Sequence, residues 1–139
     1  GMGYDLEVQA IAEAHKLDML TCPYVFDEQS AADMTRAGAD IVVAHMGLTT
    51  GGTIGAETAR TLDDCVEVIR GSQAVVKSIN PDAMVICHGG PIAEPKDADY
   101  VIQRVPGIDG FFGASSIERL AAERGIKQQT EDFKAIRTK

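Results

Sequence analysis

The stretch Ala83-Met-Val-Ile-Cys-His88-Gly-Gly-Pro91 decides the fold of this chain. Its first six residues form a short apolar run with β-branched members, which is typical of a parallel strand covered on both faces. Two glycines and a proline then turn the chain. The run Ala39-Asp-Ile-Val-Val-Ala-His45 ends in a similar way, with a histidine followed by Met46 and Gly47. Both segments predict buried strands that lead into glycine-containing loops.

Helical patterns alternate with these and two further apolar runs. Apolar residues recur at helical spacing over 4–15, 27–38, 61–76 and 95–105, and strands are expected at 19–26, 39–45, 83–88 and 108–112. Asp27 and Thr61 suit helix N-caps, and Pro95 suits a first helical turn. The alternation predicts an α/β fold with a parallel sheet of four strands.

A last helix is expected to follow the fourth strand. Ser115 and Glu118 have the spacing of a capping box, so the helix is expected to begin at Ser115. Gly125 lies inside the helical pattern, and a break is expected there.

Length and composition limit the classes of function. The 139 residues predict one domain over 1–139 and are too few for a complete eight-stranded (β/α) barrel of at least about 200 residues. The net charge is -8 and Lys and Arg do not cluster, so neither nucleic acid nor an anionic membrane is expected as a partner. No apolar run approaches the roughly 20 residues of a membrane span, and no signal-peptide pattern opens the chain, so a cytoplasmic protein is expected. Three widely spaced cysteines indicate free thiols.

Small and polar residues gather after the predicted strands, at the edge where ligands bind in parallel α/β proteins. Glycines let backbone N–H groups approach an anion, and a helix beginning at Ser115 would add its positive N-terminus. The candidate phosphate- or substrate-binding residues are Thr49, Thr50, Gly51, Gly52, Gly89, Gly90, Gly113, Ala114 and Ser115. The alternative is that the glycines only form tight turns and that Ser115 only caps its helix.

His45 and His88 are the candidate catalytic acid/base groups. Each ends a predicted strand, and imidazole titrates near neutral pH. The alternative is that each is hydrogen-bonded to a neighbouring loop without a catalytic role. Tyr24 and Thr21, near the end of the first predicted strand, could hydrogen-bond a ligand but are interpreted as packing residues.

Four segments carry a more specific pattern: Gly1-Met-Gly-Tyr4, residues 37–56 (AGADIVVAHMGLTTGGTIGA), His88-Gly-Gly-Pro-Ile92 and residues 110–120 (GFFGASSIERL). In these segments the chain resembles the phosphoenolpyruvate hydrolase-like proteins, also called TIM-barrel signal transduction proteins. The resemblance implies a (β/α)₈ barrel related to phosphoenolpyruvate and phosphonopyruvate enzymes. It covers the second half of that barrel, so the expected fold is a parallel (β/α) half of a TIM barrel with four strands alternating with helices.

The resemblance also implies Mg²⁺ held by carboxylates. No acidic cluster follows the predicted strands, and Asp40 and Asp109 begin strands, which places them at the opposite end of the sheet. The metal ligands therefore remain unknown, Mg²⁺ is implied by the resemblance alone, and no other cofactor is evident.

Two hypotheses of function follow. The first is a hydrolase-like domain, of phosphonopyruvate hydrolase type, that binds a small phosphorylated or phosphonate carboxylate. The alternative is a non-catalytic module for ligand sensing or signal transduction. A third reading is a fragment that is active only with its missing half. Because a half-barrel leaves edge strands and one apolar face exposed, a homo-oligomer is expected.

Overall fold

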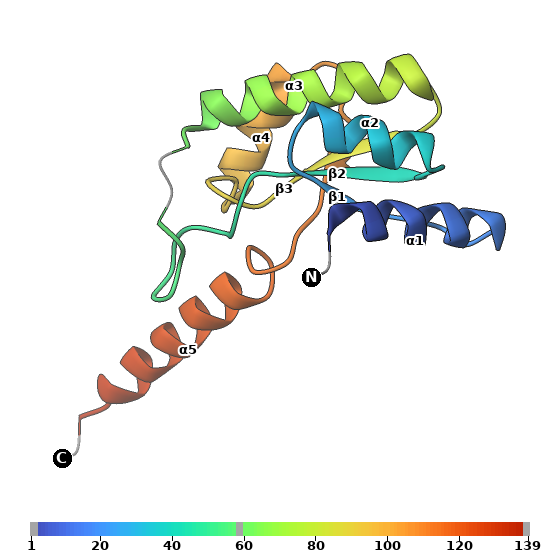
Figure 1. Ribbon diagram of the computed structural model, residues 1–139. Helices are drawn as coiled ribbons and strands as arrows, with labels where there is room; N and C mark the ends of the chain where they lie inside the picture. Colours follow the sequence, from blue (N-terminus) through green and yellow to red (C-terminus); the bar gives the residue numbers. More distant parts are fainter. Residues whose placement is uncertain (1–2, 58–59, 138–139) are drawn as a thin grey trace.

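Helices and strands alternate along the chain, as the sequence predicts (Figure 1). The computed structural model describes residues 3–57 and 60–137, so Gly1 and Met2 of the first family-like segment lie outside the described residues. The elements are α1 (Tyr4–Lys16), β1 (Tyr24–Val25), α2 (Glu28–Arg36), β2 (Ile41–His45), α3 (Leu62–Ile79), β3 (Met84–His88), α4 (Pro95–Arg104), β4 (Gly110–Phe111) and α5 (Arg119–Lys134). Across these residues, no helix is both long and apolar enough to cross a membrane.

The four strands form one parallel sheet in the order β1-β2-β3-β4. Each strand therefore pairs with its neighbour in the sequence, which confirms the predicted α/β fold. Strand β2 pairs with β3 along its full length, from Ile41 opposite Met84 to His45 opposite His88. All four carboxyl ends consequently lie at the same edge of the sheet.

Local capping sets the start of two helices. The Asp27 side chain accepts a hydrogen bond from the Ser30 N–H at 2.7 Å, and the Thr61 hydroxyl accepts one from the Asp64 N–H at 3.1 Å. Both are capping boxes, in which the third residue also bonds back to the N-cap backbone. Pro95 occupies the first turn of α4, so all three predicted helix starts are confirmed.

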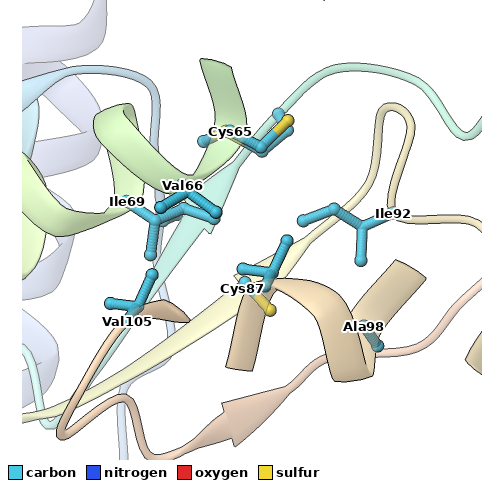
Figure 2. Close-up of a cluster of buried hydrophobic side chains, with 10 residues drawn as sticks. Cys65, Val66, Ile69, Cys87, Ile92, Ala98 and Val105 are labelled. Atoms are coloured by element: carbon cyan, nitrogen blue, oxygen red, sulfur yellow. The ribbon is translucent and has the colours of Figure 1, made fainter. Parts of the chain in front are cut away.

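The main core lies between the sheet and helices α3 and α4. Figure 2 shows Cys65, Val66 and Ile69 of α3 gathered with Cys87 of β3 and with Val105, just beyond α4. A second cluster joins α2 and the other end of α3 to β1, β2 and β3 through Val25, Ala31, Met34, Val42, Val76 and Val85. Alternate strand residues supply this core because successive side chains point to opposite faces.

The other face of the sheet is partly open. Ile41 and Val43 of β2 alternate with the core residues and share this face with Met84 and Ile86 of β3 and Tyr24 of β1. Met84 remains 43% exposed and Tyr24 38% exposed. This face would be the interior of a closed barrel.

All three cysteines are free thiols, as predicted. Cys65 and Cys87 are buried, and burial raises the pKa of each to about 11, so both stay protonated at neutral pH. Cys22 is exposed. The two buried thiols therefore act as small apolar core groups.

The first strand is shorter than the predicted 19–26. Thr21 turns its N–H and hydroxyl to the Asp40 carboxylate, at 2.8 and 2.9 Å. Pro23 has no N–H to donate to a strand ladder, although its carbonyl accepts from the Val43 N–H at 3.0 Å. Met19 lies outside the sheet and is exposed. The strand is therefore reduced to Tyr24–Val25.

The last helix also differs from the prediction. Ser115 does not cap it, because residues 114–118 form a turn in which the Ala114 carbonyl accepts from the N–H groups of Ile117 and Glu118, and α5 begins at Arg119. The expected break at Gly125 is wrong, since α5 runs through it to Lys134. A glycine inside a helix costs only about 1 kcal/mol relative to alanine. Figure 1 shows α5 extending away from the sheet.

Candidate functional site

His45 and His88 lie next to each other at the carboxyl ends of β2 and β3, because the strand register pairs them directly. Their ring centroids are 4.9 Å apart. The Tyr24 ring lies 4.7 Å from the His45 ring and stacks on the His88 ring at 5.2 Å, with 9° between the planes. We call His45 and His88 the histidine pair.

Two further aromatic rings flank the histidine pair. The Phe26 ring, just after β1, lies 5.5 Å from the His45 ring, and the Phe112 ring, just after β4, lies 5.4 Å from the His88 ring. The sequence pattern predicts Tyr24 to be a packing residue and marks neither Phe26 nor Phe112 as a site residue. The alternation of side chains places them on the face of the histidines, which is the signal that could have found them. The surroundings of the pair are therefore mainly aromatic.

His45 is half-buried and held by its own loop. The Gly47 N–H donates a hydrogen bond to its Nδ1 at 3.0 Å. Burial, and secondarily the repulsion that would arise if both imidazoles were protonated, lowers the pKa of His45 from its usual 6.5. His45 is therefore neutral at neutral pH.

His88 is more deeply placed, with 6% of its surface exposed. Its Nδ1 lies 2.7 Å from the carbonyl oxygen of Phe112. This contact links the end of β3 to the end of β4, and it brings the turn that begins with Gly113, Ala114 and Ser115 next to the histidine pair. The loop contacts of both histidines agree with the structural alternative, and they leave each Nε2 available for chemistry.

The loops after β2 and β3 are joined by backbone hydrogen bonds. The Gly90 N–H donates to the Gly47 carbonyl at 2.7 Å, and the Thr50 N–H donates to the Gly90 carbonyl at 3.0 Å. Gly89 lies against the His45 ring, where an added Cβ would be 3.7 Å from Cε1. Thr50, Gly89 and Gly90 therefore gather beside the histidine pair, but the N–H groups of Thr50 and Gly90 are already used within the protein.

The carbonyl of Thr49 accepts a hydrogen bond from the Ala56 N–H at 3.2 Å within the long loop. Gly51 and Gly52, further along this loop, lie against α5. The Arg119 guanidinium donates two hydrogen bonds to the Gly51 carbonyl, both at 3.2 Å. The Glu123 carboxylate accepts from the Thr53 N–H at 2.9 Å, and this bond, with further help from Arg119, lowers the pKa of Glu123. An added Cβ on Gly52 would meet both side chains. Arg119 is a cation beside the candidate loops that the sequence analysis missed, although it follows the Gly113–Glu118 segment directly.

The two aspartates that begin strands do not lie at this edge of the sheet. Asp40 binds Thr21, and Asp109 accepts from the Val85 N–H at 2.7 Å, both at the amino ends of the strands. Within residues 3–57 and 60–137, no three His, Cys, Asp or Glu side chains lie close enough to hold a metal ion. The residues that would hold the Mg²⁺ implied by the resemblance are therefore not identified in this part of the chain.

The fold is half of a TIM barrel. It superposes on the N-acetylmannosamine-6-phosphate 2-epimerase from Clostridium perfringens with a TM-score of 0.56 and 15% identity, covering 91% of this chain and 48% of that one. The model of the phosphoenolpyruvate hydrolase-like family matches residues 1–136, so the chain belongs to that family.

Two curated relatives come from Solanum lycopersicum. The ToMV susceptible protein tm-1(GCR26) is 52% identical and the ToMV resistance protein Tm-1(GCR237) is 51% identical, each over 136 residues. The match covers 98% of this chain in both cases. The chain spans 18% of the length of each of these relatives.

Proposed function

We propose that this chain binds a small phosphorylated or phosphonate carboxylate and acts as a hydrolase of the phosphonopyruvate hydrolase type. The observation that carries the proposal is the histidine pair, 4.9 Å apart at the carboxyl edge of the sheet. Ligands of parallel α/β proteins bind at this edge, and imidazole is the side chain best suited to proton transfer at neutral pH.

The loops beside the histidine pair support an anionic ligand. Gly89 lets the backbone come close to the Gly47 carbonyl beside His45, and Gly113, Ala114 and Ser115 follow Phe112, whose carbonyl contacts His88. Small residues leave the backbone within reach of a phosphate group. The ligand is expected to lie between these loops, with its reacting bond over the histidine pair.

Calorimetric titration and a coupled assay for pyruvate test this proposal with phosphoenolpyruvate and phosphonopyruvate. We expect binding of at least one of them, and a turnover that falls about 10²-fold or more in His45→Asn and His88→Asn. His15→Asn is the matched control, because His15 is an exposed histidine on α1. A protein that binds neither compound and gives no thermal shift with inorganic phosphate contradicts the proposal.

A second candidate function is a non-catalytic module that senses such a ligand. It is favoured by the lack of a carboxylate donor set among the described residues and by the resistance function in the name of one tomato relative. Under this reading the two histidine variants keep their affinity and the wild type shows no turnover. Measurable turnover that both variants abolish excludes it.

We also propose that the chain works as a cytoplasmic homo-oligomer. The partly open sheet face and the two edge strands β1 and β4 support self-association, and the three free cysteines suit a reducing compartment.

A further inference from the structure

The two histidines are held in opposite tautomers by their backbone partners. A backbone N–H can only donate, so the Nδ1 of His45, which receives the Gly47 N–H, carries no proton. A carbonyl oxygen can only accept, so the Nδ1 of His88, 2.7 Å from the Phe112 carbonyl, carries its proton. A neutral imidazole has a single N–H, which places the proton of His45 on Nε2 and leaves a lone pair on the Nε2 of His88.

Neither Nε2 atom is sealed from solvent. In the described part of the chain, no buried side-chain nitrogen or oxygen lacks a hydrogen-bond partner. The hydrogen bonds of the two rings are all made by Nδ1, so neither Nε2 is a buried, unpartnered atom. An N–H donor and a bare nitrogen acceptor, neither used by another residue in the described part of the chain, therefore lie on rings whose centroids are 4.9 Å apart.

The surrounding rings hold this arrangement. Tyr24 stacks on His88 and meets His45 edge-on, and Phe112 packs edge-on against His88. A flip of either imidazole would exchange Nδ1 with a ring carbon and break its backbone hydrogen bond. The ring contacts and the backbone hydrogen bonds therefore fix which ring nitrogen of each histidine carries the proton.

We propose that the two histidines have different roles: the Nε2 of His88 is the general base, and the Nε2–H of His45 is a neutral hydrogen-bond donor to an oxygen that gains negative charge. The assignment rests on the proposed function and deepens it. His45 does not act as a proton donor, because a neutral imidazole that gave up its N–H would become an anion. Its lowered pKa agrees with a neutral role.

These two roles are compatible with the proposed class of substrate. When water attacks the phosphorus of an enol phosphate, the P–O bond breaks and its electron pair stays on the enol oxygen. When water attacks a 3-phosphono-2-oxo acid, the P–C bond breaks and its electron pair is shared between C3 and the carbonyl oxygen. Both reactions leave an enolate oxygen, which the His45 N–H stabilises while the proton of the attacking water passes to His88 Nε2. The two assigned roles therefore match the enolate-forming step that the proposed hydrolysis requires.

Nuclear magnetic resonance tests the tautomers without any substrate. Long-range ¹H–¹⁵N correlation on the ¹⁵N-labelled chain at alkaline pH distinguishes protonated from bare ring nitrogens, and His15→Gln assigns the third imidazole. We expect the proton on Nε2 in His45 and on Nδ1 in His88. The same tautomer in both rings, or the reverse pattern, overturns the proposal.

Glutamine substitutions test the roles through turnover of phosphoenolpyruvate and phosphonopyruvate. A glutamine amide can place an N–H near the position of Nε2 but cannot take up a proton. His45→Gln is therefore expected to keep turnover within about 10-fold, whereas His88→Gln loses about 10²-fold or more. Equal losses, or a larger loss in His45→Gln, overturn the assignment. A wild type without turnover refutes the proposed hydrolase activity. The NMR spectrum then tests separately whether the two histidines carry their protons on different ring nitrogens.

Discussion

The surroundings of each imidazole determine what it can do. His45 and His88 are the same residue type at equivalent strand positions, yet one receives a backbone N–H and the other faces a carbonyl. A sequence pattern identifies both as strand-end histidines and cannot separate their roles, since the two partners, Gly47 and Phe112, belong to different loops.

The acid sensitivity of the fold provides a prediction at this scale. The pKa of His45 is lowered in the folded chain, so the unfolded chain binds the proton first as the pH falls. The stability contributed by neutral His45 is complete above the usual pKa of about 6.5 and is lost as the pH falls through the lower folded value. Urea unfolding between pH 8 and pH 5 should therefore show a smaller acid loss in His45→Asn, whose side-chain oxygen can still accept the Gly47 N–H. The control is His15→Asn, and an unchanged pH dependence in His45→Asn would refute this explanation.

At the scale of elements, the glycine loops differ from the glycine in α5. Gly90 has φ +59°, and an added Cβ would meet the Met46 carbonyl. Gly125 lies in α5, where an added Cβ would meet nothing within 4 Å. Glycine is required at position 90 because two loops approach each other closely there, whereas no close contact requires glycine at position 125.

Substitution by alanine should destabilise the protein at Gly90 and stabilise helix α5 at Gly125. Gly90→Ala is expected to lower the free energy of unfolding by about 1–3 kcal/mol, because the residue is forced into a left-handed conformation against a backbone carbonyl. Gly125→Ala should raise the helix content of α5, with a gain of up to about 1 kcal/mol in local helix stability. Denaturant melts and circular dichroism check both changes. Gly90→Ala with wild-type stability would mean that the loop can rearrange freely.

Whether the start of a helix or strand can be predicted depends on how far apart in the sequence its contacting residues lie. Asp27 and Thr61 cap helices through residues three positions away, so their sequence signal is local and the prediction is confirmed. The start of β1 depends on Asp40, 19 residues from Thr21. The start of α5 depends on the turn from Ala114 and on Arg119 reaching Gly51, 68 residues earlier. Such distant partners are not visible in a local pattern.

At the scale of the whole molecule, the half-barrel leaves one sheet face without its opposite wall. Tyr24, Ile41, Met84 and Ile86 lie on this face, and the edge strands β1 and β4 flank it. The solved epimerase shares this fold over 48% of its chain. The partly exposed apolar side chains are therefore the surface through which we expect self-association.

A charge on this face tests that expectation. Met84→Lys places an ammonium group at a residue that is 43% exposed, so the fold should tolerate it while association weakens. Light scattering should give a multiple of 14.8 kDa for the wild type and a lower mass for the variant. Leu17→Lys, at the exposed end of α1, is the control and should keep the wild-type mass. A monomeric wild type would contradict the proposed oligomer.

The order of strands and helices, the parallel sheet and the three helix starts were readable from the chain alone, because apolar spacing and side-chain caps act over a few residues. The pattern of residues 83–91 predicts a strand that ends in His88 and a glycine turn, and the structure confirms it with β3 at Met84–His88. The pairing of His88 with His45, the stacking of Tyr24 and the opposite tautomers arise only when three strands and two loops meet. Register and loop contacts join residues far apart in sequence, and the geometry of those contacts turns two similar histidines into a donor and an acceptor.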